Sequence, residues 1–261
     1  MKIIYSLYVI LKRAFGVIAT LPFKFKEVDV SPPKNVSHDK WIEYLSNNFN
    51  KAGLRILEVG SRNVTGYNHR SMFNNATYVG FDFYPGENVD IVGDAHKLTT
   101  YFDAEQRFDL IFSSAVFEHL YAPWEVAIQI QKCLKVGGFI FIETHFSFRS
   151  HERPWNFFQF SDMGLRALFN NALGFELIEK GMSNPMGGYF THHADPKLRY
   201  KRVKELYCHS EIFCKKTRDL ENFDWSQLNI DDIVDNTRYP EPNVQRDKNK
   251  GLFKKFQNLF N

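Results

Sequence analysis

The sequence predicts an α/β fold built on a doubly wound, mostly parallel sheet of seven strands. Short apolar runs alternate with amphipathic or turn-rich segments along the chain, which is typical of a sheet covered by helices on both faces. Each run is apolar throughout, as strands buried on both faces are. The runs lie at residues 54–59, 77–82, 88–93, 108–114, 137–145, 175–180 and 205–217.

The segments between these runs predict two helices and one long loop. Apolar residues recur at near-helical spacing over residues 123–134, and a pair of glycines then turns the chain into the next strand. Ser161 can cap a second helix, which we expect to continue to Leu173. Residues 181–204 are rich in glycine, proline and histidine. We therefore expect an irregular insertion there, serving as a lid or substrate loop.

Composition predicts one globular domain between two tails. A hydrophobic fraction of 44% and an aromatic fraction of 16% exclude a disordered chain. We expect an N-terminal helix over 1–30, the domain over 31–217 and an acidic extension with a C-terminal helix over 218–261. The formal net charge of +3 argues against a nucleic-acid partner. Three cysteines without CxxC spacing indicate a reducing, cytoplasmic compartment and argue against a structural zinc site.

Both ends of the chain have the pattern of amphipathic helices. Near the N-terminus the apolar residues Ile4, Leu7, Tyr8, Leu11, Phe15 and Ile18 share one helical face. The uncharged stretch 3–11 is too short to span a bilayer. Two interpretations remain open: peripheral contact with the inner face of a membrane, or packing of each end on the domain or on a second copy of the chain.

Acidic residues follow three predicted strands at the points where a doubly wound sheet binds ligands. Glu58 precedes Gly60 at the end of the first strand, Asp82 ends the second and Asp94 follows the third. The carboxyl ends of parallel strands lie along one edge of the sheet. One carboxylate near an ammonium group and one near ribose hydroxyls would suit methionine joined to adenosine.

Five sequence blocks carry a family resemblance. They are EVGS at 58–61, VGFD at 79–82, GDAH at 93–96, FEHL at 117–120 and LKVGG at 134–138. In order and separation they resemble the class I S-adenosylmethionine-dependent methyltransferases, especially the type 11-like subgroup. The resemblance implies a Rossmann-like methyltransferase fold over about half the chain, with S-adenosylmethionine as cofactor. Arg62 and Val64 depart from the family's usual glycine motif, where small residues stand.

The resemblance also implies a role for each matching position. Glu58 and Gly60 would border the methionine part, Asp82 would hold the ribose hydroxyls, and Asp94 would face the adenine. The full cofactor-binding set that we expect is Glu58, Gly60, Ser61, Asp82, Phe83, Asp94, Ala95, Ser113 and Ser114.

An acceptor hydroxyl must lose its proton during methyl transfer, so a general base is expected. His145 or His119 is predicted to be that base, because an imidazole titrates near neutral pH. The aromatic and basic loop after the fifth strand is expected to contact the acceptor, because aromatic rings stack on sugars and arginines bind anions. The predicted acceptor contacts are Glu118, Arg149, His151, Arg153 and Trp155.

These features predict a methyltransferase that acts on a sugar or a glycan precursor, as in polysaccharide biosynthesis. The alternatives are another small-molecule or lipid acceptor, a non-catalytic membrane-associated scaffold and a nicotinamide-dependent oxidoreductase. The last is disfavoured because the GxGxxG turn is missing. His192, His193 and Asp195 lie close together, but neighbouring histidines in a loop usually face solvent. We therefore expect no metal site.

Overall fold

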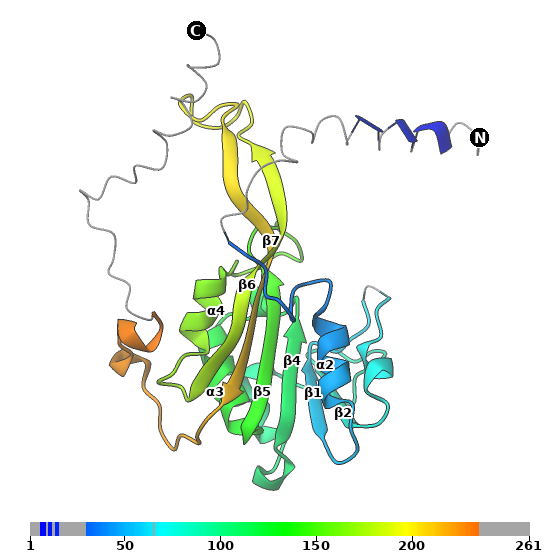
Figure 1. Ribbon diagram of the computed structural model, residues 1–261, viewed down its shortest axis with the longest axis vertical. Coiled ribbons are helices and arrows are strands. Elements are labelled where there is room, and N and C mark those ends of the chain that lie inside the picture. Colours follow the sequence, from blue (N-terminus) through cyan, green and yellow to red (C-terminus); the bar gives the residue numbers. More distant parts are fainter. Residues whose placement is uncertain (1–5, 9, 12–13, 16–29, 65, 235–261) are drawn as a thin grey trace.

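A computed structural model describes residues 6–8, 10–11, 14–15, 30–64 and 66–234, and its centre is one seven-stranded sheet (Figure 1). The strand order is β3-β2-β1-β4-β5-β7-β6. The strands are β1 Arg55–Val59, β2 Thr77–Asp82, β3 Ile91–Val92, β4 Phe108–Ser114, β5 Leu134–His145, β6 Phe175–Tyr189 and β7 Arg202–Lys216. The doubly wound α/β architecture predicted from the apolar runs is confirmed.

Strand direction divides the sheet into two parts. The pairs from β3 through β5 are parallel, whereas β7 is antiparallel to both β5 and β6. The strand order reverses between β1 and β4, which lie side by side in the middle of the sheet. Open α/β sheets bind ligands in the crevice outside the carboxyl ends of the strands at such a point.

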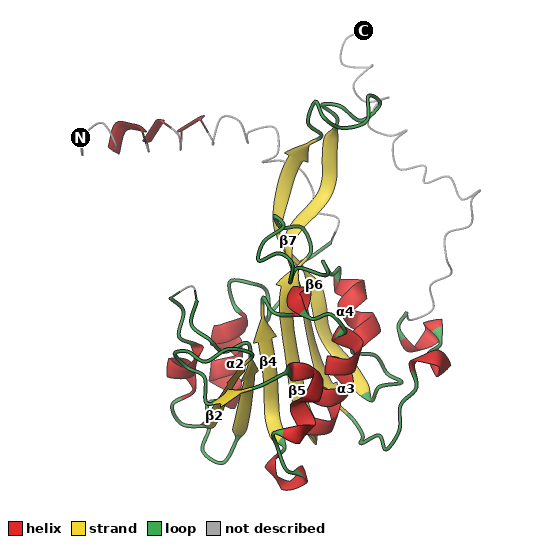
Figure 2. Cartoon of the chain, turned by 180° about the vertical axis from the view of Figure 1, so that it is seen from behind, coloured by secondary structure: helices red, strands yellow, loops and turns green. Residues whose placement is uncertain are grey.

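Helices cover both faces of the sheet, as the apolar strands require (Figures 1 and 2). Helix α2, Trp41–Phe49, packs on one face through Trp41 and Leu45. Helices α3, Pro123–Cys133, and α4, Asp162–Leu168, pack on the other through residues such as Ile130 and Leu165. Each face therefore has its own buried core.

Helix α4 ends earlier than the sequence predicts. Ser161 caps it as expected, because its hydroxyl oxygen accepts a hydrogen bond from the Gly164 amide at 3.0 Å. The side chain of Asn170 then accepts from the Leu173 amide at 2.8 Å and donates to Ala167 O at 2.8 Å. These side-chain bonds replace helical hydrogen bonds, so the helix stops at Leu168 and not at Leu173.

The predicted irregular insertion over 181–204 is wrong. Strands β6 and β7 pair continuously along most of this segment, from Phe175 opposite Lys216 to Tyr189 opposite Arg202, so only residues 190–201 connect them. Pro185 is tolerated because β6 is the edge strand of the sheet. The distal part of this hairpin projects from the globular part of the molecule (Figure 1).

One further expectation near the first strands needs correction. Strand β3 covers only Ile91 and Val92, not the whole of 88–93. The chain after β1 forms an irregular loop and then a 3-10 helix over His69–Phe73.

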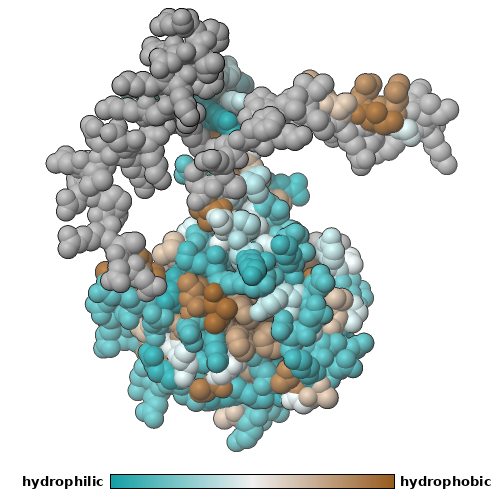
Figure 3. Space-filling model, viewed as in Figure 1, coloured by the Kyte–Doolittle hydropathy of each residue, from teal (hydrophilic) through white to brown (hydrophobic). Residues whose placement is uncertain are grey.

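The two tails are described only in part. The described residues between 6 and 15 are helical, and Leu7, Tyr8, Ile10, Leu11 and Phe15 are 57% to 73% exposed, seen as a brown patch outside the globular part in Figure 3. No helix within the described ranges is long and apolar enough to cross a membrane. The predicted C-terminal helix lies outside the described residues, whereas Trp225 of the extension packs against the core.

Candidate active site

The loop after β1 crosses directly over the end of β2. The amides of Gly60 and Ser61 donate to Phe81 O at 2.8 and 3.1 Å. Gly60 has φ of +87°, and a Cβ there would lie 2.1 Å from a methyl carbon of Val116. Only glycine fits this turn, because it tolerates the left-handed conformation and leaves room for the chain beyond β4.

Asp82 and Asp94 lie on adjacent segments at this edge. The carboxylate of Asp82 accepts from the Arg62 amide at 3.2 Å and the Tyr84 amide at 2.9 Å. The Gly93 amide donates to Asp82 O at 2.9 Å and so holds the segment before Asp94 against β2. The structure thus brings these two predicted residues together.

Asp94 is fixed by its neighbour His96. Its Oδ1 lies 2.9 Å from the His96 amide and 2.7 Å from His96 Nδ1. Partial burial alone would raise the pKa of Asp94, but the hydrogen bonds from His96 outweigh it and lower this pKa below its usual value. The carboxylate is therefore ionised and held in place.

The other predicted cofactor residues lie at or near the same edge of the sheet, with different exposures. Ser61 Oγ is buried without a hydrogen-bond partner in the described part of the chain, so it is an orphaned polar atom at the site. Phe83 is 56% exposed and Ala95 is buried. Ser113 is buried and donates to Val59 O at 2.8 Å, while Ser114 donates to Glu143 Oε1 at 2.8 Å.

Glu58 differs from the other two acids, because it is buried beneath the loop. Its carboxylate lies 2.8 Å from His69 Nδ1 and accepts a hydrogen bond from the Tyr78 hydroxyl. Burial raises the pKa of Glu58 although His69 opposes the change. Sequence reasoning missed both partners, since neither lies in a recognised block.

The segment after β4 places Glu118 against the end of β5. Ala115 has φ of +55°, which turns the chain sharply into a 3-10 helix over Phe117–His119. Glu118 is fully buried, and its carboxylate accepts from Thr144 Oγ1 at 2.6 Å and lies 2.5 Å from His145 Nδ1. Burial alone would raise the pKa of Glu118, but these hydrogen bonds outweigh it and lower this pKa.

Another carboxylate–histidine pair lies at the same edge and was not predicted. His38 Nδ1 is 2.8 Å from Glu143 Oε2, and Glu143 is buried at the end of β5. The hydrogen bond that His38 donates to Glu143 raises the pKa of His38 above 6.5, although partial burial opposes it. The ring of His209 stacks on that of His38 with centroids 3.9 Å apart. Burial lowers the pKa of His209 to about 4, so its ring is neutral.

The loop over 146–160 runs across the site from β5 towards β2. The Phe157 amide donates to Glu118 O at 2.8 Å and the Phe160 amide to His145 O at 2.9 Å. Trp155 is half exposed, and its ring centroid is 6.5 Å from that of Phe83. Among the predicted acceptor contacts, Arg149 and Arg153 are exposed and His151 is half-buried.

A cavity of about 450 Å³ lies away from these residues. Its lining includes Phe102 and Arg107, which precede β4, and Cys133 at the end of α3. It is therefore at the opposite edge of the sheet and contains none of the predicted site residues.

Comparisons with solved structures find methyltransferases of low sequence identity. A structure of 1,6-didemethyltoxoflavin-N1-methyltransferase from Burkholderia thailandensis is 13% identical, with 68% of this chain and 76% of that chain covered and a TM-score of 0.48. A putative methyltransferase from Bacillus halodurans is 14% identical, with 68% and 99% covered and a TM-score of 0.49. No curated protein matches the chain.

These structural likenesses are too distant to define a family by themselves, so the assignment depends on the sequence of the domain. Residues 35–180 match the family described as "Methyltransferase domain", and they contain α2, α3, α4, β1 to β5 and the predicted cofactor-binding residues. The chain therefore belongs to this methyltransferase domain family and is a class I methyltransferase that uses S-adenosylmethionine.

Proposed function

We propose that this enzyme methylates a hydroxyl group of a sugar or a glycan precursor. The observation that carries the proposal is the pair formed by His38 and the buried Glu143, beside the end of β4. A hydroxyl is a poor nucleophile until it loses its proton, and a histidine oriented by a carboxylate is suited to removing it. Acceptors that need no base would leave this pair without a role.

We propose that the cofactor lies across the crevice from Gly60 to Asp94. S-adenosylmethionine supplies a methyl group on a sulfonium centre. Asp82 would bind the ribose hydroxyls and Asp94 with Ala95 the adenine, while the orphaned Ser61 Oγ offers a hydrogen bond to the ligand. Phe83, Ser113 and Ser114 would border it. Glu58 would act from beneath the loop by holding His69.

The proton would pass to His38. Because Nδ1 of His38 faces Glu143, the imidazole keeps Nε2 as its basic atom. His38 would take the acceptor's proton at Nε2, and the acceptor oxygen would then bond to the methyl carbon. The carbon–sulfur bond breaks with its electron pair passing to sulfur, which leaves S-adenosylhomocysteine. The sequence favoured His145 or His119, but His145 is buried against Phe148 with ring centroids 4.3 Å apart, whereas His38 is partly exposed.

The acceptor would lie between this histidine and the loop over 146–160. Trp155 and Phe157 present exposed aromatic rings, and Arg149 and Arg153 present exposed cations. Aromatic rings stack on the apolar faces of sugars, and guanidinium groups bind phosphate or carboxylate. A sugar joined to an anionic group, such as a nucleotide sugar or an acidic glycan, suits this surface.

The test is release of S-adenosylhomocysteine by the full chain with a panel of nucleotide sugars, acidic oligosaccharides, amines, phenols and lipids. We expect turnover with a sugar and a product methylated on oxygen. Trp155→Ala should raise KM for the sugar, whereas Tyr200→Ala, an exposed aromatic residue in the loop between β6 and β7, should not. Turnover confined to amines or lipids would overturn the sugar assignment.

We also propose that the N-terminal helix contacts an anionic membrane surface. The support is its exposed apolar side chains, among them Leu7 and Leu11, beside basic residues in the sequence. Flotation with anionic liposomes should recover the full chain but not the double variant Leu7→Glu, Leu11→Glu. Equal recovery of both, or dimerisation of the full chain through this helix, would contradict the proposal.

A further inference from the structure

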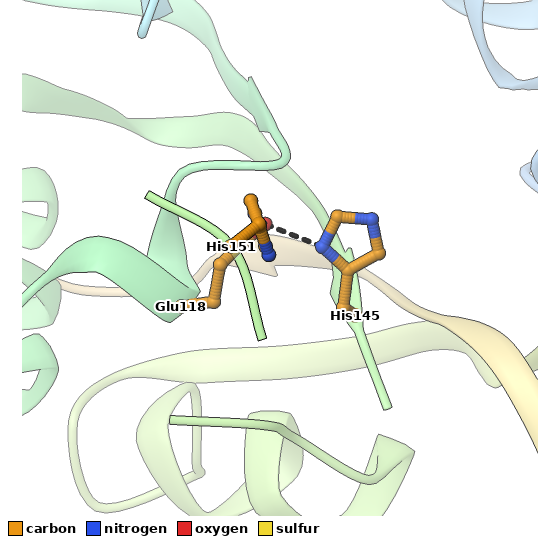
Figure 4. Close-up of side chains that lie close together, drawn as sticks. All are labelled: Glu118, His145 and His151. Atoms are coloured by element: carbon orange, nitrogen blue, oxygen red, sulfur yellow. Dashed lines mark hydrogen bonds and ion pairs between the residues drawn. The ribbon is translucent and has the colours of Figure 1, made fainter. Parts of the chain in front are cut away.

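We propose that Glu118, His145 and His151 bind a divalent transition-metal ion. The three side chains come from the turn after β4, the end of β5 and the loop that follows β5, and Figure 4 shows them converging. One ligand atom from each lies within 4.8 Å of the others. Sequence reasoning did not consider these three residues together, because they belong to three separate segments.

Two histidine rings face the same carboxylate oxygen. Glu118 Oε1 lies 2.5 Å from His145 Nδ1 and 4.0 Å from His151 Nε2. The rings of His145 and His151 are nearly perpendicular, with centroids 5.4 Å apart, so they approach a common point from different directions. Small side-chain rotations would bring all three donors within bonding distance of one ion.

The hydrogen bonds behind these side chains fix their orientation. His151 Nδ1 lies 3.0 Å from Arg149 O, so its N–H donates there and the lone pair of Nε2 faces Glu118. Thr144 Oγ1 donates to Glu118 Oε2 at 2.6 Å, so the ion would bind at Oε1 and replace the proton that Oε1 shares with His145 Nδ1. Such outer partners are typical of metal ligands, because they set the tautomer and the direction of the lone pair.

A third imidazole adjoins the group. His119 Nδ1 lies 2.8 Å from Trp155 O, and its Nε2 is 3.8 Å from Glu118 Oε1. It is therefore oriented in the same way as His151. Nitrogen from two or three imidazoles with one carboxylate suits zinc or iron(II), whereas magnesium prefers oxygen ligands.

The role of the ion rests on the proposed function, although its binding does not. Three protein ligands leave a coordination position open, as in catalytic zinc sites. An acceptor hydroxyl bound there would lose its proton more readily, since a divalent ion lowers the pKa of a bound oxygen acid. His38 would remain the group that receives the proton.

The test uses Co²⁺ as the probe, because its visible absorption reports coordination directly. The full chain, freed of metal by a chelator and then dialysed, is titrated with Co²⁺ without cofactor or acceptor. We expect one equivalent to bind with ligand-field bands in the visible. His151→Ala should weaken binding at least about tenfold, because it removes a ligand. His151 lies on a loop and is half-buried, so this variant should fold.

The control is the double variant His192→Ala, His193→Ala, which removes two exposed neighbouring histidines from the loop between β6 and β7. It should keep both the bands and the affinity. An unchanged spectrum in His151→Ala, or loss of binding in the control, would overturn the site. Folded chain that binds S-adenosylhomocysteine but no Co²⁺ would also overturn it, and would leave the proposed function standing. Co²⁺ binding without turnover on any sugar would instead remove the sugar assignment.

Discussion

Glu143 and Glu211 lie directly opposite each other on the antiparallel strands β5 and β7, and both side chains are buried. Opposite residues on such strands have their Cβ atoms about 4.5 to 5.5 Å apart, so two charged carboxylates would repel each other. Burial, assisted by the charge of Glu143, raises the pKa of Glu211 to about 8. Glu211 is therefore protonated at neutral pH, and Glu143 is the member of the pair that orients His38.

The first prediction concerns the pH dependence of stability. The pKa of Glu211 is higher in the folded state, so its contribution to stability is complete below its ordinary pKa of 4.5 and is lost as pH rises to about 8. Glu211→Gln removes this loss. We expect the variant to exceed the wild type by about 4 to 5 kcal/mol in unfolding free energy at about pH 9, and by less than about 1 kcal/mol at about pH 5. Urea unfolding at both pH values measures it, and an equal difference at the two would contradict the pairing.

The second prediction concerns the cofactor. Asp82→Asn keeps the shape of the side chain but removes the negative charge of the carboxylate, whose oxygens would accept hydrogen bonds from the ribose hydroxyls. Hydrogen bonds to a charged group contribute about 1.5 to 3 kcal/mol, so S-adenosylhomocysteine should bind at least about tenfold more weakly by titration calorimetry. The exposed Asp103→Asn variant should bind normally. Equal affinities in the two variants would place the ribose elsewhere.

The third prediction concerns proton removal. The pKa of His38 is raised by its hydrogen bond to Glu143, so activity should rise with pH through a value above 6.5 as the ring loses its proton. His38→Gln should lower kcat by about 10²- to 10⁴-fold and abolish that rise, while affinity for S-adenosylhomocysteine stays unchanged. His193→Gln, at an exposed position, serves as the control. A variant that keeps both its rate and its pH profile would rule out His38 as the base.

The fourth prediction concerns a buried lysine. Lys216 is fully buried. Its ammonium group donates to the carbonyl of Gln131 in α3, to that of Leu134 at the start of β5, and to the carboxylate of Asp219. Lys216→Met leaves these acceptors unpaired and should lower the free energy of unfolding by about 2 to 3 kcal/mol. The neighbouring Lys215→Met, at a half-buried position, should change it by less than about 0.5 kcal/mol. Similar unfolding midpoints for the two variants would contradict this role.

Local sequence patterns predicted those features of the structure that residues close together in the sequence determine. The apolar run at 108–114 became β4, Gly60 lies just after β1 in a positive-φ turn, and His145 ends β5. These outcomes follow from periodicity, backbone conformation and the geometry of parallel strands.

The parts that were missed depend on contacts between distant residues. His38 and Glu143 are 105 positions apart, and only the packing of the segment before α2 brings them together. The strand character of residues 181–189 was hidden by local glycine and proline signals, because pairing with β7 decides it. A metal-binding cluster assembled from three segments is undetectable in the same way.

The outer end of the hairpin formed by β6 and β7 should unfold locally, independently of the rest of the domain. Strand β5 pairs with β7 only from His209 onward. Among the described residues, the outer rungs, such as Pro185 with Tyr207 and Gly188 with Val203, therefore have strand partners only within the hairpin. A two-stranded ribbon is only marginally stable by itself. Its amide hydrogens should therefore exchange with solvent by local fraying, at a free energy far below that of global unfolding, while those of β4 and β5 exchange only when the whole domain unfolds.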